Sequence, residues 1–397
     1  MKLATRTTRI TPSPTLQLSA TVKALVAQGQ QIFDFTAGEP SFDSPDVAKS
    51  AAITAIREGF TKYTAVTGID DLKNAIIDKF QKDQGLQYTR SQILVSCGAK
   101  HTLFNLALAL FEAGDEVIIP APYWVSYPEQ VQVADATPVF LPTEENSGYD
   151  IDLDKLKAAV TSRTKALILN SPCNPTGGIY HRNTLEGVAK LASEHNFLVI
   201  SDEIYEKMIY DNHKHVSIAS ISPEVAQRTI IVNGVSKTYS MTGWRIGYAA
   251  GPEPLIKAMG DIQSQSTSNP TSIAQKAAIG ALRGGQDFVR TMVQELDIRR
   301  TTMVKGLNAI AGIQCPMPTG AFYAFPNIKD LLGRRFQETT LSSPFALADF
   351  LLKEAKVACV PGEPFGAPNH LRFSYTPTLE VIQKGLKSLA EAVARLK

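Results

Sequence analysis

Several features of membrane proteins and nucleic-acid-binding proteins are missing from this sequence of 397 residues. No apolar run approaches the roughly 20 residues of a membrane-spanning helix, and the run LALALF at 106–111 is far too short. The formal net charge is only +2. A charge this small gives no electrostatic reason to expect binding to nucleic acid or to an anionic membrane. Apolar content of 44% with 20% charged residues is instead typical of a soluble globular enzyme.

Cysteine is scarce, and its positions have neither metal-ligand nor disulfide spacing: Cys97, Cys173, Cys315 and Cys359. This usage indicates a reducing compartment. The first fifteen residues contain no acidic residue, as in a transit peptide, but no apolar signal-peptide core follows them. We therefore expect a cytoplasmic protein. The six histidines show no convergent spacing, and the pair in HKH at 213–215 lies in a polar stretch, so no metal site is expected.

Short apolar runs that suit buried strands recur along the chain: 92–96, 116–120, 137–141, 166–170, 198–201, 229–232 and 246–250. Helical patterns separate many of them, for example at 100–112 and 183–194. Strands that are apolar on both faces and alternate with helices predict an α/β fold with a mostly parallel sheet covered on both sides. No G-x-G-x-x-G motif follows any of these runs, which argues against a nicotinamide-dependent dehydrogenase.

The pattern changes near residue 285, where a long charged helical segment leads into shorter strands and a closing helix at 378–396. A chain of this length is expected to fold as two domains. We expect a large domain over 45–290. Residues 1–44 and 291–397 are expected to form a smaller, discontinuous α+β domain.

Polar residues follow four of the apolar runs. CGAK follows 92–96, SPCNPTG follows 166–170, DEIY follows 198–201, and NGVSK follows 229–232. In an open parallel sheet, ligands bind beyond the carboxyl ends of the strands. These turns are therefore expected to converge on one crevice.

Several of these segments form a known combination. SPCNPTGG, SDEIYE and SKTYSMTGWRIGYAAGP, together with YWVSYPE and LRFSY, resemble the fold-type I aminotransferases, which use pyridoxal 5'-phosphate (PLP). The resemblance is strongest to the bacterial-type aspartate aminotransferases, a subgroup that includes aspartate/prephenate enzymes, and it extends from about residue 8 to the C-terminus. It implies a three-layer sandwich with a mostly parallel seven-stranded sheet, a smaller α+β domain, and a homodimer with shared active sites.

The resemblance assigns the catalytic roles. Lys237 would form the Schiff base with PLP and then move the proton between the substrate and the cofactor. Its setting in a small, partly apolar turn favours the neutral amine, whereas a lysine considered alone would be an ordinary surface residue. Asp202 would hold the pyridine nitrogen protonated, although an aspartate here could also cap a turn. Tyr205 and Asn174 would contact the phenolate oxygen.

The phosphate group is expected at the turn after the first apolar run. Gly98, Ala99 and Lys100 open a helix there, and the free N–H groups of a helix start bind anions. Arg245 matches the family's phosphate-binding arginine, and Ser236 could add a hydroxyl. Many relatives have a serine where this chain has Gly234.

The resemblance also places two aromatic side chains at the cofactor. Trp124 would stack on the pyridine ring and border the substrate. Tyr63 would reach the phosphate bound by the neighbouring subunit; the less favoured alternative is an ordinary exposed loop residue.

Substrate recognition rests first on Arg372, whose family counterpart binds the substrate α-carboxylate next to Asn174. Gly38 matches a backbone position that closes over the same group. A distal carboxylate needs a second cation. In one aspartate aminotransferase subgroup an arginine of the partner subunit serves, but the corresponding segment here, QSQSTSNPTSIAQ, contains none. In the subgroup that this chain resembles, a lysine takes this role, and Lys100 in CGAK matches it. Ser13 and Thr15 are expected to line the same pocket.

These assignments predict a ping-pong transamination of L-aspartate and 2-oxoglutarate to oxaloacetate and L-glutamate, with prephenate as a further amino acceptor. The alternative is another PLP aminotransferase or lyase that acts on an aromatic amino acid or on alanine, since the scaffold supports several reactions. A non-catalytic regulator is disfavoured because Lys237, Asp202, Asn174 and Arg372 are all present.

Overall fold

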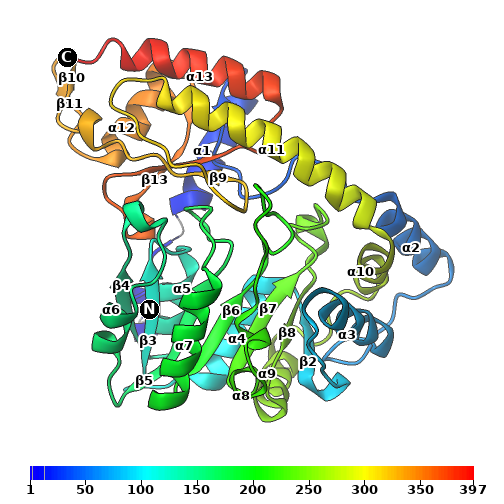
Figure 1. Ribbon diagram of the computed structural model, residues 1–397. Coiled ribbons are helices and arrows are strands. Elements are labelled where there is room, and N and C mark those ends of the chain that lie inside the picture. Colours follow the sequence, from blue (N-terminus) through cyan, green and yellow to red (C-terminus); the bar gives the residue numbers. More distant parts are fainter. Residues whose placement is uncertain (2, 13) are drawn as a thin grey trace.

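A computed structural model describes residues 1, 3–12 and 14–397. Its centre is a seven-stranded sheet in the order β2-β8-β7-β6-β5-β3-β4 (Figure 1). Each apolar run named above forms one of its strands: β2 (Ile93–Ser96), β3 (Glu116–Ala121), β4 (Thr137–Pro142), β5 (Thr164–Asn170), β6 (Leu198–Asp202), β7 (Thr229–Gly234) and β8 (Gly247–Ala250). Only β8 runs antiparallel to its neighbours, β2 and β7. The predicted mostly parallel, seven-stranded sheet is confirmed.

Helices cover both faces of this sheet because alternate residues of each strand point to opposite sides. In β7, Ile230 and Val232 pack against the first helical layer, and Ile231 packs against the second. The first layer contains α4 (Ala99–Leu110), α5 (Ser126–Val133) and α9 (Glu253–Ser266). The second layer contains α3 (Asp70–Gln84), α6 (Leu153–Ala159), α7 (Arg182–His195), α8 (Pro223–Ala226) and α10 (Ser272–Gly284).

Local sequence signals account for the ends of two of the early helices. Pro45 directly precedes α2 (Asp46–Arg57), and Gly59 lies just beyond it with φ 71°. α3 ends at Gly85, which adopts the left-handed conformation (φ 71°) that glycine tolerates best. Both helices thus end at or just before a glycine with positive φ.

Most of the remaining elements pack around a separate hydrophobic core. They are β1 (Phe33–Asp34), α11 (Gln286–Asn308), β9 (Tyr323–Ala324), β10 (Arg335–Phe336), α12 (Pro344–Phe350), β12 (Val357–Ala358), β14 (Leu371–Ser374) and α13 (Leu379–Val393). β11 (Thr339–Thr340) pairs with β10, while α1 (Pro14–Ala27) and β13 (Val360–Pro361) contribute Leu18 and Val360 to a smaller cluster around Phe325 and Phe365. β13, β14 and β9 form a three-stranded sheet, and β1 pairs in parallel with β12.

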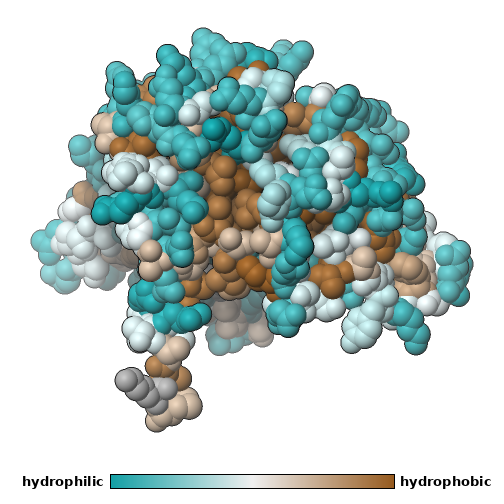
Figure 2. Space-filling model, turned by 90° about the horizontal axis from the view of Figure 1, so that it is seen from below, coloured by the Kyte–Doolittle hydropathy of each residue, from teal (hydrophilic) through white to brown (hydrophobic). Residues whose placement is uncertain are grey.

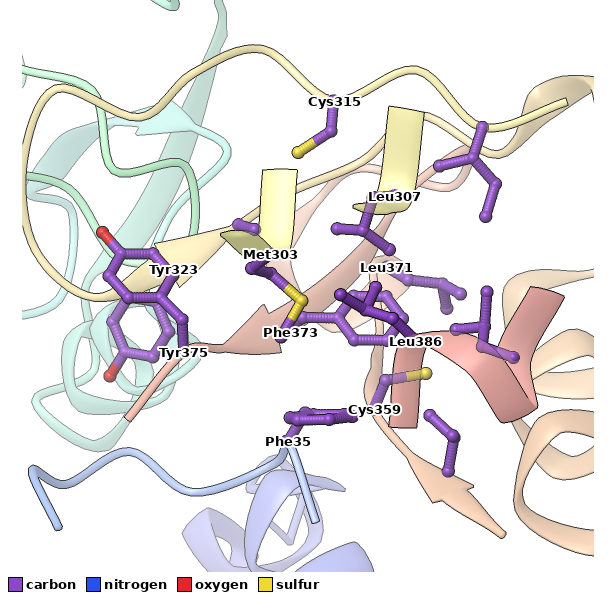
Figure 3. Close-up of a cluster of buried hydrophobic side chains, with 14 of the residues drawn as sticks. Phe35, Met303, Leu307, Cys315, Tyr323, Cys359, Leu371, Phe373, Tyr375 and Leu386 are labelled. Atoms are coloured by element: carbon purple, nitrogen blue, oxygen red, sulfur yellow. The ribbon is translucent and has the colours of Figure 1, made fainter. Parts of the chain in front are cut away.

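Side chains that are far apart in the sequence meet in this second core (Figure 3). Phe35 follows β1, Met303 and Leu307 come from α11, Phe373 from β14 and Leu386 from α13. The segment before α2 is thus packed with the C-terminal third of the chain. The domain limits at 45 and 290 remain a prediction.

No helix in the described part of the chain is both long enough and apolar enough to cross a membrane.

Candidate active site

A cavity of about 520 Å³ lies at the carboxyl ends of the central strands. The predicted site residues in its lining are Thr15, Gly38, Ala99, Lys100, Trp124, Asn174, Asp202, Tyr205, Ser236, Lys237, Arg245 and Arg372. Gly98 lies directly beneath the guanidinium of Arg245. Tyr63 is outside this lining, and Ser13 lies outside the described residues. The turns after β2, β5, β6 and β7 therefore do converge, as parallel strands require.

Lys237 lies in the turn after β7 and directs its amine into the cavity. Its Nζ donates a hydrogen bond to the carbonyl oxygen of Gly38, at 2.5 Å. Burial lowers the pKa of Lys237 to about 8; Glu39 opposes this shift, and the positive charges of Arg245 and Arg372 add to it. A sizeable fraction of the amine is therefore neutral near pH 7–8, which a nucleophile or proton acceptor requires.

Asp202 ends β6 and is 4% exposed. Its Oδ2 accepts a hydrogen bond from the hydroxyl of Tyr127 at 2.7 Å, and its Oδ1 accepts one from the backbone N–H of Ile204 at 3.2 Å. Burial raises the pKa of Asp202 to about 6. Among the described residues it has no ion-pair partner within 4 Å. A buried carboxylate of this kind is stabilised by a cation, and the protonated nitrogen of a pyridine ring supplies one.

The start of α4 is built to receive an anion. Its first N–H groups have no acceptor within the helix, and the guanidinium of Arg245 lies over Gly98. A Cβ atom on Gly98 would be 2.3 Å from Nη2 of Arg245, so only glycine permits this approach. Arg245 donates to the carbonyl oxygens of Thr242 (2.7 Å) and Cys97 (3.4 Å) and has no acidic partner among the described residues. These groups fit a phosphate.

The absence of a serine at position 234 has a steric reason. A Cβ atom on Gly234 would lie 2.9 Å from the carbonyl oxygen of Ile246 and 3.1 Å from Cα of Gly247. The close pairing of β7 with β8 leaves no room for a side chain there. Ser236, which is buried and lines the cavity, is the hydroxyl-bearing residue available in this turn.

Arg372, from β14, is a buried guanidinium with open hydrogen-bonding capacity. It is 3% exposed and donates to Oδ1 of Asn174 (2.9 Å) and to the carbonyl oxygen of Thr36 (3.0 Å). Its guanidinium carbon lies 4.6 Å from the ring centre of Tyr323 and 5.1 Å from that of Phe365. Its Nε is buried without a partner, and no carboxylate of the described residues pairs with it. Arg372 is therefore poised to bind a carboxylate that enters the cavity.

Lys100 offers a second positive charge in the same cavity. Its Nζ lies 4.9 Å from the ring centre of Trp124, a cation–π distance. Burial lowers the pKa of Lys100, and the charge of Arg245 adds to this effect. The Trp124 ring packs edge-on against Tyr127, with 5.3 Å between ring centres. Apart from Arg245 at the start of α4, Arg372 and Lys100 can thus serve two carboxylates.

Several lining residues were not predicted from the sequence. Tyr127 holds Asp202, and the hydroxyl of Tyr323 lies 2.9 Å from that of Tyr205. Asn170 accepts a hydrogen bond from the backbone N–H of Asn174 at 2.8 Å. Lys23 of α1 lies at the rim. Tyr127 belongs to the segment YWVSYPE and Tyr323 to the strand pattern AFYAF, so a tyrosine among small or apolar residues was the available signal.

Tyr63 lies between α2 and α3, with its side chain 91% exposed. Its predicted contact with the phosphate of a neighbouring subunit stays a prediction.

Comparison with known proteins gives consistent results. The family model described as aminotransferase class I and II matches residues 30–389. The chain is 49% identical to an aspartate aminotransferase of Geobacillus stearothermophilus, over 98% of both chains. It is 44% identical to an aspartate/prephenate aminotransferase of Nitrosomonas europaea, over 99% of this chain and 100% of the relative. The solved structure of the Rhizobium meliloti aspartate aminotransferase superposes with a TM-score of 0.96 at 41% identity, over all of both chains.

Proposed function

The chain belongs to the class I and II aminotransferases, and we propose that it transfers the amino group of L-aspartate to 2-oxoglutarate in a ping-pong reaction. The products are oxaloacetate and L-glutamate. The relatives of highest identity described above carry the name aspartate aminotransferase or aspartate/prephenate aminotransferase. The cofactor is PLP, as in this family, and the buried, cation-free Asp202 and the anion cradle of Arg245 and α4 fit its two charged ends.

One observation carries the choice of substrate: two cations, Arg372 and Lys100, line one cavity and neither has a carboxylate partner among the described residues. Aspartate, glutamate and their 2-oxo acids all have two carboxylates. Arg372 binds the α-carboxylate in this scheme, and Lys100 binds the distal one. A solved structure of the Thermus thermophilus aspartate aminotransferase, at 39% identity, contains maleate, which is also a dicarboxylate.

The side chains around the cavity divide the chemistry. PLP, when bound, supplies an electron-accepting ring that makes the substrate α-carbon acidic. Lys237 Nζ would take the α-proton from the substrate and deliver it to the reacting carbon of the cofactor. The lowered pKa of Lys237 keeps part of the amine neutral for this task. Asp202 would hold a proton at the ring nitrogen. Tyr205 and Asn174 would hold the ring through its oxygen. Arg372 fixes the α-carbon through the carboxylate.

Prephenate is a further amino acceptor in this proposal. The N. europaea relative is named for both substrates. Lys100 is a flexible point charge at the cavity and makes geometrically less strict contacts than an arginine fork would. This difference is compatible with distal carboxylates at more than one distance from the reacting carbon.

We further propose that the protein works as a homodimer in which Tyr63 contacts the phosphate bound by the second subunit. Support comes from the 91% exposure of Tyr63 and from the exposed apolar side chains of Val47, Ile53 and Ile56 on the preceding helix α2. Figure 2 also shows apolar side chains gathered near the centre of the face seen from below. Exposed apolar patches commonly mark protein interfaces.

A closing motion and a location complete the proposal. Residues 1–44 and 291–397 would move as one small domain over the large domain at 45–290, since Gly38 and Arg372 bring that part of the chain to the cavity. The cytoplasm is the proposed location, and it rests on the four cysteines, all of which are unpaired.

A coupled assay tests the reaction. Purified protein loaded with PLP should transfer the amino group of aspartate to 2-oxoglutarate and, in a parallel reaction, to prephenate. Borohydride reduction should fix the cofactor at Lys237. If neither aspartate nor glutamate donates an amino group while the cofactor is fixed at Lys237, the substrate proposal is wrong and only the cofactor assignment stands.

A further inference from the structure

A second buried polar cluster adjoins the active site. Glu203 follows Asp202 in the chain, so the two side chains point to opposite sides of the strand end; Asp202 lines the cavity and Glu203 does not. Glu203 is 0% exposed. Its Oε1 accepts hydrogen bonds from Ser201 (3.0 Å) and Ser217 (2.6 Å). Its Oε2 lies 3.0 Å from Nε2 of His215 and accepts from Gln84 at 2.9 Å. Each oxygen therefore has two polar contacts.

Further charges surround this carboxylate. Glu206 pairs with Nζ of Lys79 at 2.5 Å and also accepts from Nε2 of Gln84 at 2.9 Å. Lys79 lies 3.7 Å from Asp83, which pairs with Lys207 at 2.8 Å. These residues come from α3 and from the segment after β6. The buried hydroxyl of Tyr88 is a further titratable neighbour, since the charge of Glu203 contributes to raising the pKa of Tyr88.

The cluster satisfies the spacing of a metal site, because one ligand atom each from Glu203, Glu206 and His215 lie within 4.8 Å of one another. However, the ammonium group of Lys79 is already 2.5 Å from Glu206. A buried lysine therefore supplies the positive charge that a metal would bring. His215 was expected in a polar loop, but only 9% of its side chain is exposed and it pairs with Glu203.

The cluster can act on Asp202 in two ways. Glu203 ties the end of β6 to α3 through Gln84 and to the following loop through His215 and Ser217. It thereby fixes the backbone that directs Asp202 into the cavity. Its negative charge also acts on Asp202 directly and contributes to raising the pKa of that carboxyl. The charge of Glu206 is not among the largest influences on the pKa of Asp202.

We propose that Glu203 is a positioning residue for transamination. It orients Asp202, and its negative charge, which His215 partly offsets, stabilises the protonated form of the bound cofactor. This inference rests on the proposed function, because it requires PLP at Asp202. The negative charge favours protonation at the cofactor, and the His215 partner reduces that effect when its ring is protonated.

Two substitutions with opposite expected signs test the proposal. The readout is the pH midpoint of the visible absorption band of the PLP-loaded protein. Glu203→Gln removes the negative charge and should lower this midpoint by roughly half a pH unit, because the positive charge of Lys79 already offsets part of the charge of Glu203. His215→Gln removes the moderating partner and should raise the midpoint.

The matched control is Glu206→Gln, a change of the same size in the same cluster, at a carboxylate that is not among the largest influences on Asp202. It should shift the midpoint less than either variant does. Circular dichroism melting of the PLP-free proteins reports the structural cost of each change separately. If Glu203→Gln does not fold, the proposal is tested by the direction in which His215→Gln shifts the pH midpoint of the absorption band.

Shifts of the same sign in both variants, or no shift in a folded His215→Gln protein, would overturn the proposal and leave a purely structural cluster. A wild-type protein with no PLP absorption band would instead overturn the proposed function. The two failures are thus distinguishable.

Discussion

Arg372 and Lys100 both present a positive charge to the same cavity, yet the protein holds them differently. Arg372 is 3% exposed, hydrogen-bonded to Asn174 and Thr36, and lies near two aromatic rings. Lys100 has a cation–π contact with Trp124, and its Nζ has no hydrogen-bond acceptor among the described residues. The fixed cation suits the carboxylate that every amino acid substrate shares. The looser one suits the part of the substrate that varies.

Substitution of Lys237, whose amine lies in the same cavity as these cations, should have the largest effect on activity. Lys237→Ala should lower kcat by roughly 10⁴-fold, because both the nucleophile and the proton carrier are lost. Steady-state assays with aspartate measure this loss. Borohydride should then fail to fix PLP covalently. Lys100→Ala is the control, since its protein should still be labelled at Lys237; a Lys237→Ala protein that keeps even a tenth of the activity would contradict the assignment.

Arg372→Ala should weaken transition-state binding, measured through kcat/KM, by about 2–5 kcal/mol, as expected for loss of a buried charge pair. The loss should be similar for aspartate, glutamate and a monocarboxylate amino acid such as alanine, because all of them share the α-carboxylate. Arg372→Lys should recover only part of it, since a lysine lacks the bidentate fork. An effect confined to dicarboxylates would reverse the roles given to the two cations.

Lys100→Ala should have a smaller and selective effect. We expect transition-state binding of aspartate, measured through kcat/KM, to weaken by about 1.5–3 kcal/mol, the range of a hydrogen bond to a charged group. Turnover of a monocarboxylate amino acid should barely change. The ratio of the two kcat/KM values is the measurement, and an unchanged ratio would remove Lys100 from the distal subsite.

The smallest effect is one of stability, and it concerns the PLP-free protein. The pKa of Asp202 is raised from 3.8 to about 6, so the folded state binds a proton more tightly than the unfolded state. The resulting stability is present below pH 3.8 and is lost as the pH rises through 6. At pH 7.5, Asp202→Asn should therefore stabilise the PLP-free protein, by about 1–3 kcal/mol.

Urea unfolding at pH 7.5 and near pH 4 measures this change, and the gain should shrink at the lower pH. The same substitution should weaken PLP binding, since the ring nitrogen loses its carboxylate. Tyr127→Phe is the matched control: it removes the donor to Asp202 and should destabilise the PLP-free protein at pH 7.5. A destabilised Asp202→Asn protein at that pH would show that the carboxylate is not under strain.

Much of this site could be predicted because its residues follow strands that can be recognised in the sequence as short apolar runs. Asp202 comes directly after one such run, and Lys237 lies in the turn that follows another. The direction of β8 could not be predicted, because a strand buried on both faces looks the same whether parallel or antiparallel. Tyr323 was missed for another reason. It reaches Tyr205 only through the packing of β9, 118 residues further along the chain, and local patterns do not record such pairings.

The reversal of β8 has a consequence for the active-site loop. Because β7 and β8 are antiparallel neighbours, the loop that connects them begins and ends on the same side of the sheet and is about a dozen residues long. Lys237 and Arg245 both lie in this one loop. Lengthening this turn by one residue would displace the amine of Lys237 relative to the guanidinium of Arg245, so neither side chain can be repositioned independently of the other.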